Sequence, residues 1–179
     1  LSKVRVPTGL PGCNRPTLRM NSIKTVAVVG AGQMGVGIAQ AAAMGGYAVR
    51  LYDVSAERLA GAAAVIGESL ARQASRGLID ATAAEAALGR IAMVQSLAEV
   101  GQSDLVIEAA VEDEAVKKAI LADLVPHLAP DTLLASNTSS ISITRLASAT
   151  DRPERFIGLH FMKPAPVMKL VEIIRGIAT

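Results

Sequence analysis

Short apolar runs alternate with longer segments of helical period along most of the chain. Strands are predicted at 23–29, 47–52, 91–94, 104–107, 132–135, 156–161 and 170–174, and helices at 33–46, 56–76, 82–89, 113–125 and 141–149. This alternation is typical of a mostly parallel sheet with helices packed on both faces. The last two strands flank a short loop with two prolines, which predicts that the final strand is antiparallel.

The helical stretches between residues 56 and 89 are longer than a single crossover between parallel strands requires. We expect them to form either a helical arm that projects from the sheet or an elaborate crossover without a binding role.

Residues 1–22 lack a hydrophobic period and contain Pro7, Pro11 and Pro16. We expect a flexible extension at 1–22 and one domain at 23–179. The extension is basic and free of acidic residues, so a transit peptide is an alternative, although the prolines disfavour the amphipathic helix that such a peptide needs. Met20 as a natural start is another alternative. The expected location is cytoplasmic, or the mitochondrial matrix if this segment is a transit peptide.

Charge and composition disfavour a nucleic-acid-binding protein. The 18 basic and 16 acidic residues give a net charge of +2, but the four basic residues of 1–22 account for the excess, and the rest carries about −2. Two tyrosines, two phenylalanines and no tryptophan offer few stacking surfaces for bases. Cys13 is the single cysteine, so no internal disulfide forms, which fits a reducing compartment. No metal site is expected.

The stretch 25–49 carries no charge and is long enough to span a bilayer. It also contains six glycines and two glutamines within a strand–turn–helix pattern. The breaks fall where a dinucleotide-binding fold needs them, so no membrane span is predicted.

A glycine-rich turn follows the first predicted strand and opens the first predicted helix. It reads Gly30-Ala-Gly32-Gln33-Met34-Gly35. The first glycine permits a tight turn, the second lets a pyrophosphate approach the backbone, and the third lets helix and strand pack closely. The free N–H groups of the helix N-terminus favour phosphate binding. The pattern predicts a Rossmann-like, doubly wound domain that binds a dinucleotide. The alternative is a glycine turn with a purely structural role.

Asp53 follows the second predicted strand, 23 residues after Gly30. A carboxylate there accepts hydrogen bonds from the adenosine ribose and repels a 2′-phosphate, which predicts NAD rather than NADP as the cofactor. The alternative is that Asp53 only supplies a negative charge near a helix N-terminus.

Three later segments are more specific than the glycine motif. They are Ser-Asn-Thr-Ser-Ser at 136–140, Gly-Leu-His-Phe at 158–161 and Pro-Ala-Pro-Val-Met-Lys-Leu-Val-Glu at 164–172. Together they closely resemble the 3-hydroxyacyl-CoA dehydrogenase family, and the likeness runs from about Ile23 to the last residue. The resemblance implies an NAD-binding domain followed by a C-terminal helical domain that completes the active site and supports dimerisation. We therefore expect the chain to be an incomplete enzyme, inactive alone and a homodimer when complete.

The last two predicted strands also indicate a catalytic pair. If they form an antiparallel hairpin centred near Pro166, His160 lies opposite Glu172. A carboxylate beside an imidazole selects its tautomer and favours its protonated form, as a general base for an alcohol requires. By resemblance, His160 takes the 3-hydroxyl proton while hydride passes to NAD, and Glu172 orients the imidazole.

The resemblance implies roles for further residues. Ser139 would hydrogen-bond the substrate oxygen, although Ser139 or Ser140 could instead cap the helix predicted from 141. The implied cofactor contacts beyond the glycine motif are Asp53, Glu112, Lys117 and Asn137, and the implied contacts to coenzyme A on the arm are Ser69 and Arg76.

One position departs from the family pattern. Relatives commonly have asparagine three residues after the catalytic histidine, and this chain has Lys163. A cation beside the positively charged nicotinamide is unfavourable, so either Lys163 points to solvent or the chemistry is altered.

The sequence thus predicts the NAD-binding domain of an enzyme of fatty-acid β-oxidation that converts L-3-hydroxyacyl-CoA to 3-oxoacyl-CoA. An NAD-binding module without turnover and a different β-hydroxyacid dehydrogenase are the alternatives.

Overall fold

A computed structural model describes residues 23–179; the expectations for residues 1–22, including Met20 and Cys13, lie outside the described residues. The elements occur in the order β1 (Thr25–Val29), α1 (Gln33–Met44), β2 (Ala48–Tyr52), α2 (Ala56–Ser75), α3 (Ala81–Gly89), β3 (Ile91–Met93), α4 (Leu97–Val100), β4 (Leu105–Glu108), α5 (Glu114–Leu124), the 3-10 turn η1 (Val125–His127), β5 (Leu133–Ser136), α6 (Ile143–Ala147), the 3-10 turn η2 (Pro153–Arg155), β6 (Phe156–Phe161) and β7 (Val171–Arg175).

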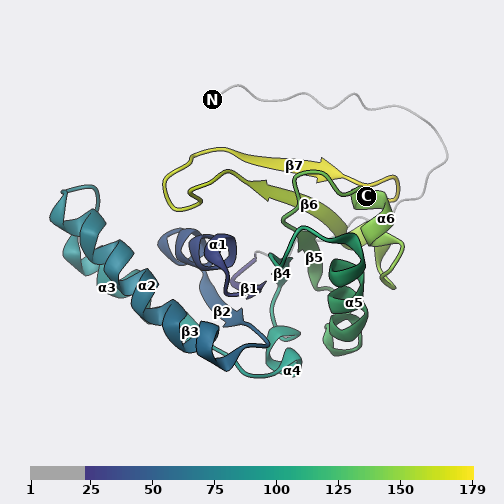
Figure 1. Cartoon of the computed structure of the whole chain (residues 1–179), viewed down its shortest axis with the longest axis horizontal. Helices are drawn as coiled ribbons and strands as arrows, with labels where there is room; N and C mark the ends of the chain where they lie inside the picture. The colour runs from purple at the N-terminus through teal and green to yellow at the C-terminus, as the bar shows by residue number, and fades with distance from the viewer. Residues whose placement is uncertain (1–22) are drawn as a thin grey trace.

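The seven strands form one sheet in the order β3-β2-β1-β4-β5-β6-β7 (Figure 1). Strands β1 to β6 are mutually parallel, and β7 is antiparallel to β6. The predicted doubly wound α/β sheet and its final antiparallel strand are confirmed. The strand order reverses between β1 and β4, which is where ligands bind in open sheets of this kind.

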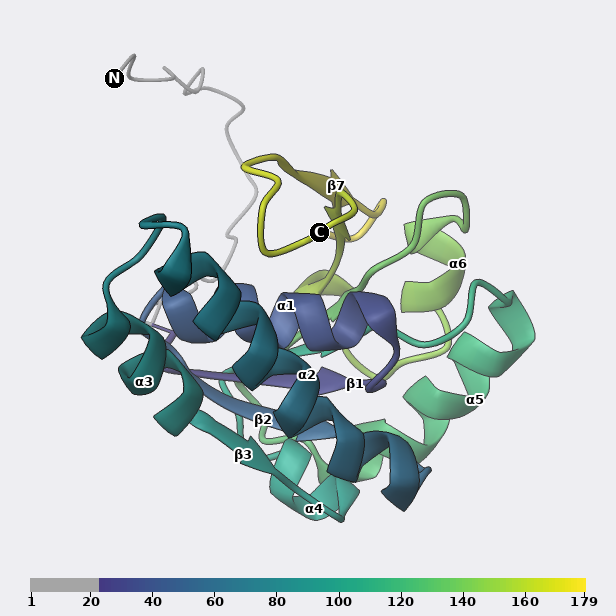
Figure 2. The ribbon, with the colours of Figure 1, turned by 60° about the vertical axis from the view of Figure 1, so that its left-hand side comes forward.

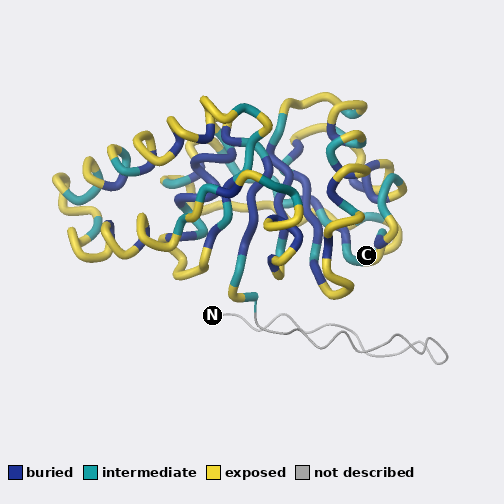
Figure 3. The backbone as a smooth tube through the Cα atoms, turned by 90° about the horizontal axis from the view of Figure 1, so that it is seen from below, coloured by how far each residue is buried: buried dark blue, intermediate teal, exposed yellow. Residues whose placement is uncertain are grey.

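The helices cover both faces of the sheet because strand side chains alternate between them. Val26 and Val28 of β1 face a core built with α1, α2 and α3. Ala27 and Val29 face a second core built with α4, α5 and α6. In Figure 3 the buried positions follow the central strands and one side of each arm helix.

Helices α2 and α3 form the predicted arm, which projects beyond the sheet (Figures 1 and 2). The buried side chains of α2 recur every three or four residues, at Leu59, Ala62, Ile66 and Leu70, so one stripe packs inward. The hydroxyl of Ser55 accepts from the Arg58 N–H and caps the helix start.

Helix α4 has no counterpart among the predicted elements. Four residues are too few to show a period, but Ser96 and Glu99 cap the helix start in a manner similar to a capping box. The Ser96 hydroxyl accepts from the Glu99 N–H, and the Glu99 carboxylate accepts from the Gln95 N–H and the Ser96 hydroxyl. This Ser-x-x-Glu pattern was the available signal.

No helix within residues 23–179 has both the length and the apolar character needed to cross a bilayer. The uncharged stretch 25–49 folds into β1, α1 and the start of β2.

Candidate active site

The glycine motif forms the turn between β1 and α1 at the carboxyl edge of the sheet. Gly30 has φ +112°, a conformation that favours glycine, and its N–H donates to the Tyr52 carbonyl oxygen at 2.7 Å. A Cβ on Gly35 would lie 1.7 Å from the Gly30 carbonyl oxygen, so only glycine permits this approach of α1 to the strand. A Cβ on Gly32 would meet nothing within 4 Å. The space beside Gly32 is therefore open to a ligand.

The start of α1 fits an anionic ligand. Gly32 is the N-cap residue, no side chain caps the helix, and its first turn carries no acidic residue. The first N–H groups of α1 are thus left without a side-chain acceptor, as phosphate binding requires.

Asp53 lies beside this turn and holds it in place. Its Oδ2 accepts from the Ala31 N–H at 2.7 Å, and its Oδ1 accepts from the Ser55 N–H at 2.8 Å. The carboxylate therefore joins the glycine turn to the start of α2, a role that the sequence did not reveal.

A largely apolar groove of about 470 Å³ extends from this turn. Four of the predicted cofactor contacts lie in it beside Gly30, namely Gly32, Gln33, Met34 and Asp53. Its other walls come from the segments after β2 and β4 and from α5, including Val54, Ala109, Ala110, Val111, Val116 and Ile120. The shape and the donor set fit a dinucleotide with apolar surroundings for its rings.

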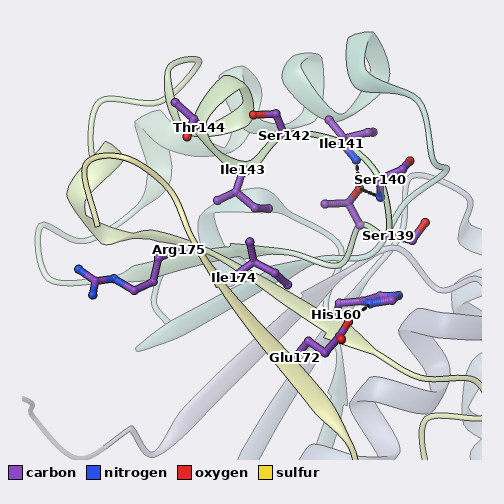
Figure 4. Close-up of a pocket in the computed structure, with 11 residues that line it drawn as sticks. Ser139, Ser140, Ile141, Ser142, Ile143, Thr144, His160, Glu172, Ile174 and Arg175 are labelled. Atoms are coloured by element: carbon purple, nitrogen blue, oxygen red, sulfur yellow. Dashed lines mark hydrogen bonds and ion pairs between the residues drawn. The ribbon is translucent and has the colours of Figure 1, made fainter. Parts of the chain in front are cut away.

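A second pocket of about 330 Å³ lies between the residue 138–144 segment and β7 (Figure 4). Ser139, His160 and Glu172 all line it. The structure thus brings the three predicted catalytic residues together.

His160 and Glu172 form a direct pair across the hairpin, as the predicted register requires. They are cross-strand partners, and the distance from His160 Nδ1 to Glu172 Oε2 is 2.8 Å. This bond directs the Nδ1 proton to the carboxylate and leaves Nε2 for another group. Among residues 23–179, no hydrogen bond engages Nε2. The geometry is that of a general base held by a carboxylate.

Glu112 supports the segment that carries Ser139. Its Oε1 accepts from Thr138 Oγ1 at 2.6 Å, from the Ser139 N–H at 2.9 Å and from the Ser140 N–H at 3.1 Å. Burial by itself raises the pKa of Glu112, but the hydrogen bonds from Thr138, Ser139 and Ser140 outweigh burial and lower the pKa to about 2. The carboxylate is therefore ionised at neutral pH.

A buried ion pair lies beneath this segment. Lys117 of α5 and Glu108 at the end of β4 both have fully buried side chains, with 2.8 Å between Lys117 Nζ and Glu108 Oε1. Ser136 at the end of β5 donates to Glu108 Oε2 at 2.5 Å. These contacts join two neighbouring strand ends to α5. Sequence reasoning missed Glu108 and assigned no role to Ser136 within its motif; the available signal was a polar residue at the end of each apolar strand.

Four predicted cofactor contacts are not among the residues that line the groove: Gly35, which packs against Gly30, and Glu112, Lys117 and Asn137. Glu112 and Lys117 make the contacts just described, and the Oδ1 of Asn137 accepts from the Phe161 N–H at 3.0 Å. Their assignment as cofactor contacts stays a prediction. Lys163 is exposed in the loop between β6 and β7.

The two predicted coenzyme A contacts lie on the arm. Ser69 belongs to α2 and is half-buried, and Arg76 is the exposed C-cap residue of that helix. Neither lines the groove or the pocket.

The N-cap of α6 tests the capping alternative for Ser139 and Ser140, whereas the substrate contact of Ser139 stays a prediction. Ser142, and not Ser139 or Ser140, caps this helix, since its hydroxyl accepts from the Arg145 N–H at 3.4 Å. The capping alternative for Ser139 and Ser140 is wrong because the helix begins at Ile143, two residues later than predicted.

Within residues 23–179, no group of three or more histidine, cysteine or acidic side chains could hold a metal ion.

Comparisons with known proteins identify the family. Residues 25–179 match the family described as 3-hydroxyacyl-CoA dehydrogenase, NAD binding domain. A 3-hydroxybutyryl-CoA dehydrogenase of Bradyrhizobium diazoefficiens is 57% identical over 157 residues, which cover 88% of this chain and 54% of that protein. A fatty acid oxidation complex subunit alpha of Pseudomonas syringae is 41% identical over 154 residues, which cover 86% of this chain and 21% of that protein.

Solved structures show the same fold. The crystal structure of 3-hydroxybutyryl-CoA dehydrogenase from Escherichia coli K12 matches with a TM-score of 0.84 and 50% identity, over 88% of this chain and 33% of that one. The (S)-3-hydroxybutyryl-CoA dehydrogenase from Ralstonia eutropha matches with a TM-score of 0.85 and 44% identity, over 88% of this chain and 56% of that one. The chain spans about half the length of several curated relatives that it matches.

Proposed function

The chain belongs to the 3-hydroxyacyl-CoA dehydrogenase family through its NAD-binding domain, and on that premise we propose that it supplies the cofactor site and the catalytic base for oxidising L-3-hydroxyacyl-CoA to 3-oxoacyl-CoA. The observation that carries the proposal is the His160–Glu172 pair, which shares a pocket with Ser139. NAD supplies the hydride acceptor when it is bound.

The residues present fit the cofactor. The open space at Gly32 and the uncapped start of α1 suit a pyrophosphate, and Asp53 lies in the same groove to accept hydrogen bonds from a ribose. The Asp53 carboxylate opposes a 2′-phosphate, so NAD is the preferred dinucleotide.

The base acts through the nitrogen that Glu172 leaves free. His160 takes the proton of the 3-hydroxyl at Nε2 while Nδ1–H stays on the carboxylate. The negative charge of Glu172 stabilises the imidazolium that results. Ser139 contributes a hydroxyl that hydrogen-bonds the reacting oxygen and orients it toward the base.

The coenzyme A moiety is assigned to the arm. Ser69 lies six residues before the last residue of α2, and Arg76 directly follows that residue as the C-cap, so both lie near the end of this arm helix. Arg76 would attract the phosphates of coenzyme A, and its replacement by glutamate should raise KM for the acyl-CoA more than it lowers kcat.

A second, C-terminal helical domain is the proposed partner within the whole protein. The pocket is open on one side, since the side chains of His160 and Glu172 are 24% and 52% exposed. Apolar side chains of the β6–β7 hairpin are also exposed, with Val167 at 65% and Ile173 at 70%. A domain that covers this face would exclude water from the reacting groups. The homodimer and the cytoplasmic location stay predictions.

The test follows NADH formation from 3-hydroxybutyryl-CoA, comparing the chain alone with the chain joined to the C-terminal domain of its relatives. We expect robust turnover only with both domains, and His160→Gln should lower kcat by about 10²–10⁴-fold. His127→Gln is the matched control, because His127 is an exposed residue of η1. Turnover that survives His160→Gln would remove the base assignment, and robust turnover by the chain alone would remove the need for the second domain.

A further inference from the structure

The carboxylate of Glu112 collects the hydrogen-bond donors of the serine segment on one oxygen. Besides Thr138 Oγ1 and the N–H groups of Ser139 and Ser140, both serine hydroxyls lie 3.1 Å from Oε1. Five donors therefore surround one oxygen atom of Glu112.

More donors lie around this oxygen than it can accept well-aligned hydrogen bonds from. An ionised carboxyl group offers about four lone-pair sites over its two oxygens. The two N–H groups are fixed by the backbone, and the Thr138 contact at 2.6 Å is the shortest of the five. The serine hydroxyls rotate freely and are thus the replaceable members.

Lys117 holds the opposite side of the same carboxylate. Its Nζ lies 3.8 Å from Glu112 Oε2 and is itself fully buried against Glu108. An ionised Glu112 can only accept hydrogen bonds, so it orders the N–H and O–H groups of residues 138–140. It cannot donate a hydrogen bond to a substrate oxygen, and it therefore does not take the place of the Ser139 hydroxyl as a donor.

Glu112 also marks the boundary between the two cavities. Ala109, Ala110 and Val111 line the dinucleotide groove, whereas Glu112 hydrogen-bonds the residue 138–140 segment that lines the pocket. Glu112 thus connects a segment of the groove wall to a segment of the pocket wall, while Val116 and Ile120 of α5 line the groove again.

We propose that Glu112 is a positioning residue for Ser139: it orders the backbone of the serine segment and holds the Ser139 hydroxyl until a substrate oxygen replaces the carboxylate as its acceptor. When Ser139 turns to the substrate, Glu112, whose side chain is 38% exposed, keeps Thr138, the Ser140 hydroxyl and both backbone donors. The identity of the incoming oxygen rests on the proposed function, whereas the ordering of the segment does not.

The first experiment measures hydrogen exchange and NAD affinity on the chain with Glu112→Ala. We expect the amides of Ser139 and Ser140 to exchange at least about tenfold faster, because they lose their acceptor. The dissociation constant for NAD, measured on the same variant, tests separately the cofactor contact that was predicted for Glu112. Glu85→Gln, an exposed carboxylate change on α3, should alter neither quantity. If Glu112→Ala does not fold, Glu112→Gln replaces it, with faster exchange again expected.

The opposite result would overturn the proposal. Unchanged exchange at Ser139 and Ser140 together with a tenfold weaker affinity for NAD would make Glu112 a cofactor contact. This readout needs no turnover, so it decides the role of Glu112 even if the proposed dehydrogenase activity is absent.

The second experiment is a double-mutant cycle in the two-domain protein. Ser139→Ala and Glu112→Gln should each lower kcat, the first by about 10²-fold, and the double variant should be no slower than Ser139→Ala. Independent, multiplying effects on kcat would show that Glu112 does not act through Ser139.

Discussion

Asp53 combines an observed structural role with a predicted contact to the cofactor ribose. Both of its oxygens already accept backbone N–H groups, one from the glycine turn and one from the start of α2. A substitution at this position therefore acts on the shape of the turn as well as on the ribose contact.

We expect the wild-type chain to bind NAD more tightly than NADP, and Asp53→Asn to narrow that difference by about tenfold, or about 1.4 kcal/mol. Asparagine removes the charge that repels a 2′-phosphate and retains one acceptor for the turn, so it should weaken NAD binding less than Asp53→Ala does. Titration calorimetry with both dinucleotides measures these affinities, and Asp80→Asn on the arm serves as the control. Equal affinities in the wild type would refute the assignment.

Glu112 makes the stability of the domain sensitive to acid. Its pKa is about 2 in the folded chain and near 4.5 when unperturbed, so its contribution to the free energy of unfolding is complete above about pH 5. The contribution is lost as the pH falls toward 2, because the carboxyl group then binds a proton and loses its role as an ionised acceptor.

Thermal unfolding at pH 7, 5, 4 and 3 tests this linkage. The Tm of the wild type should fall more steeply below pH 5 than that of Glu112→Gln, which cannot titrate. Parallel Tm curves for the two proteins would contradict the proposed ionised state.

At the scale of elements, the turn between β1 and α1 contains one glycine that the fold requires and another that leaves space for a ligand. Gly35 is required by a backbone contact inside the fold, whereas Gly32 faces open space. The same type of residue therefore serves two different purposes three positions apart.

We expect Gly32→Val to keep a Tm close to that of the wild type but to bind NAD at least about 100-fold more weakly, because the side chain occupies the approach to the pyrophosphate. Gly35→Ala should lower the Tm itself, since its Cβ overlaps the Gly30 carbonyl oxygen. Circular dichroism and calorimetry separate the two effects. A Gly32→Val protein that unfolds early, or that binds NAD normally, would contradict this division.

At the scale of the whole molecule, the β6–β7 hairpin presents an incompletely covered surface. Within the described residues β7 is an edge strand, and its exposed apolar residues continue those of the preceding loop, with Leu170 54% and Ile173 70% exposed. Edges of this kind tend to pair with other chains, and charged side chains prevent the pairing.

We expect the chain to self-associate with increasing concentration and Ile173→Lys to suppress this association, while its Tm changes little because the residue is exposed. Val65→Lys is the matched control, since Val65 is an exposed apolar residue on the arm. Sedimentation velocity over a range of concentrations measures the average mass. A monomeric wild type at every concentration would show that this surface does not drive association.

Much of the architecture could be predicted because local patterns carry it. Hydrophobic periodicity located all seven strands, the arm and the antiparallel end, with boundaries displaced by one or two residues. The pairing of His160 with Glu172 was also predictable, because an antiparallel hairpin centred near Pro166 places these two residues opposite each other.

Other features depended on contacts between residues distant in sequence. The sequence alone determined which residues are the candidates for binding and catalysis: the glycine turn, Asp53, Ser139, His160 and Glu172, whose roles stay predictions. Only the tertiary structure decided that Glu112 supports the serine segment and that Lys117 is buried against Glu108, because those contacts join the ends of different strands to α5. A charged residue in sequence carries no sign of whether it faces solvent or a partner; the packing of the chain around it decides.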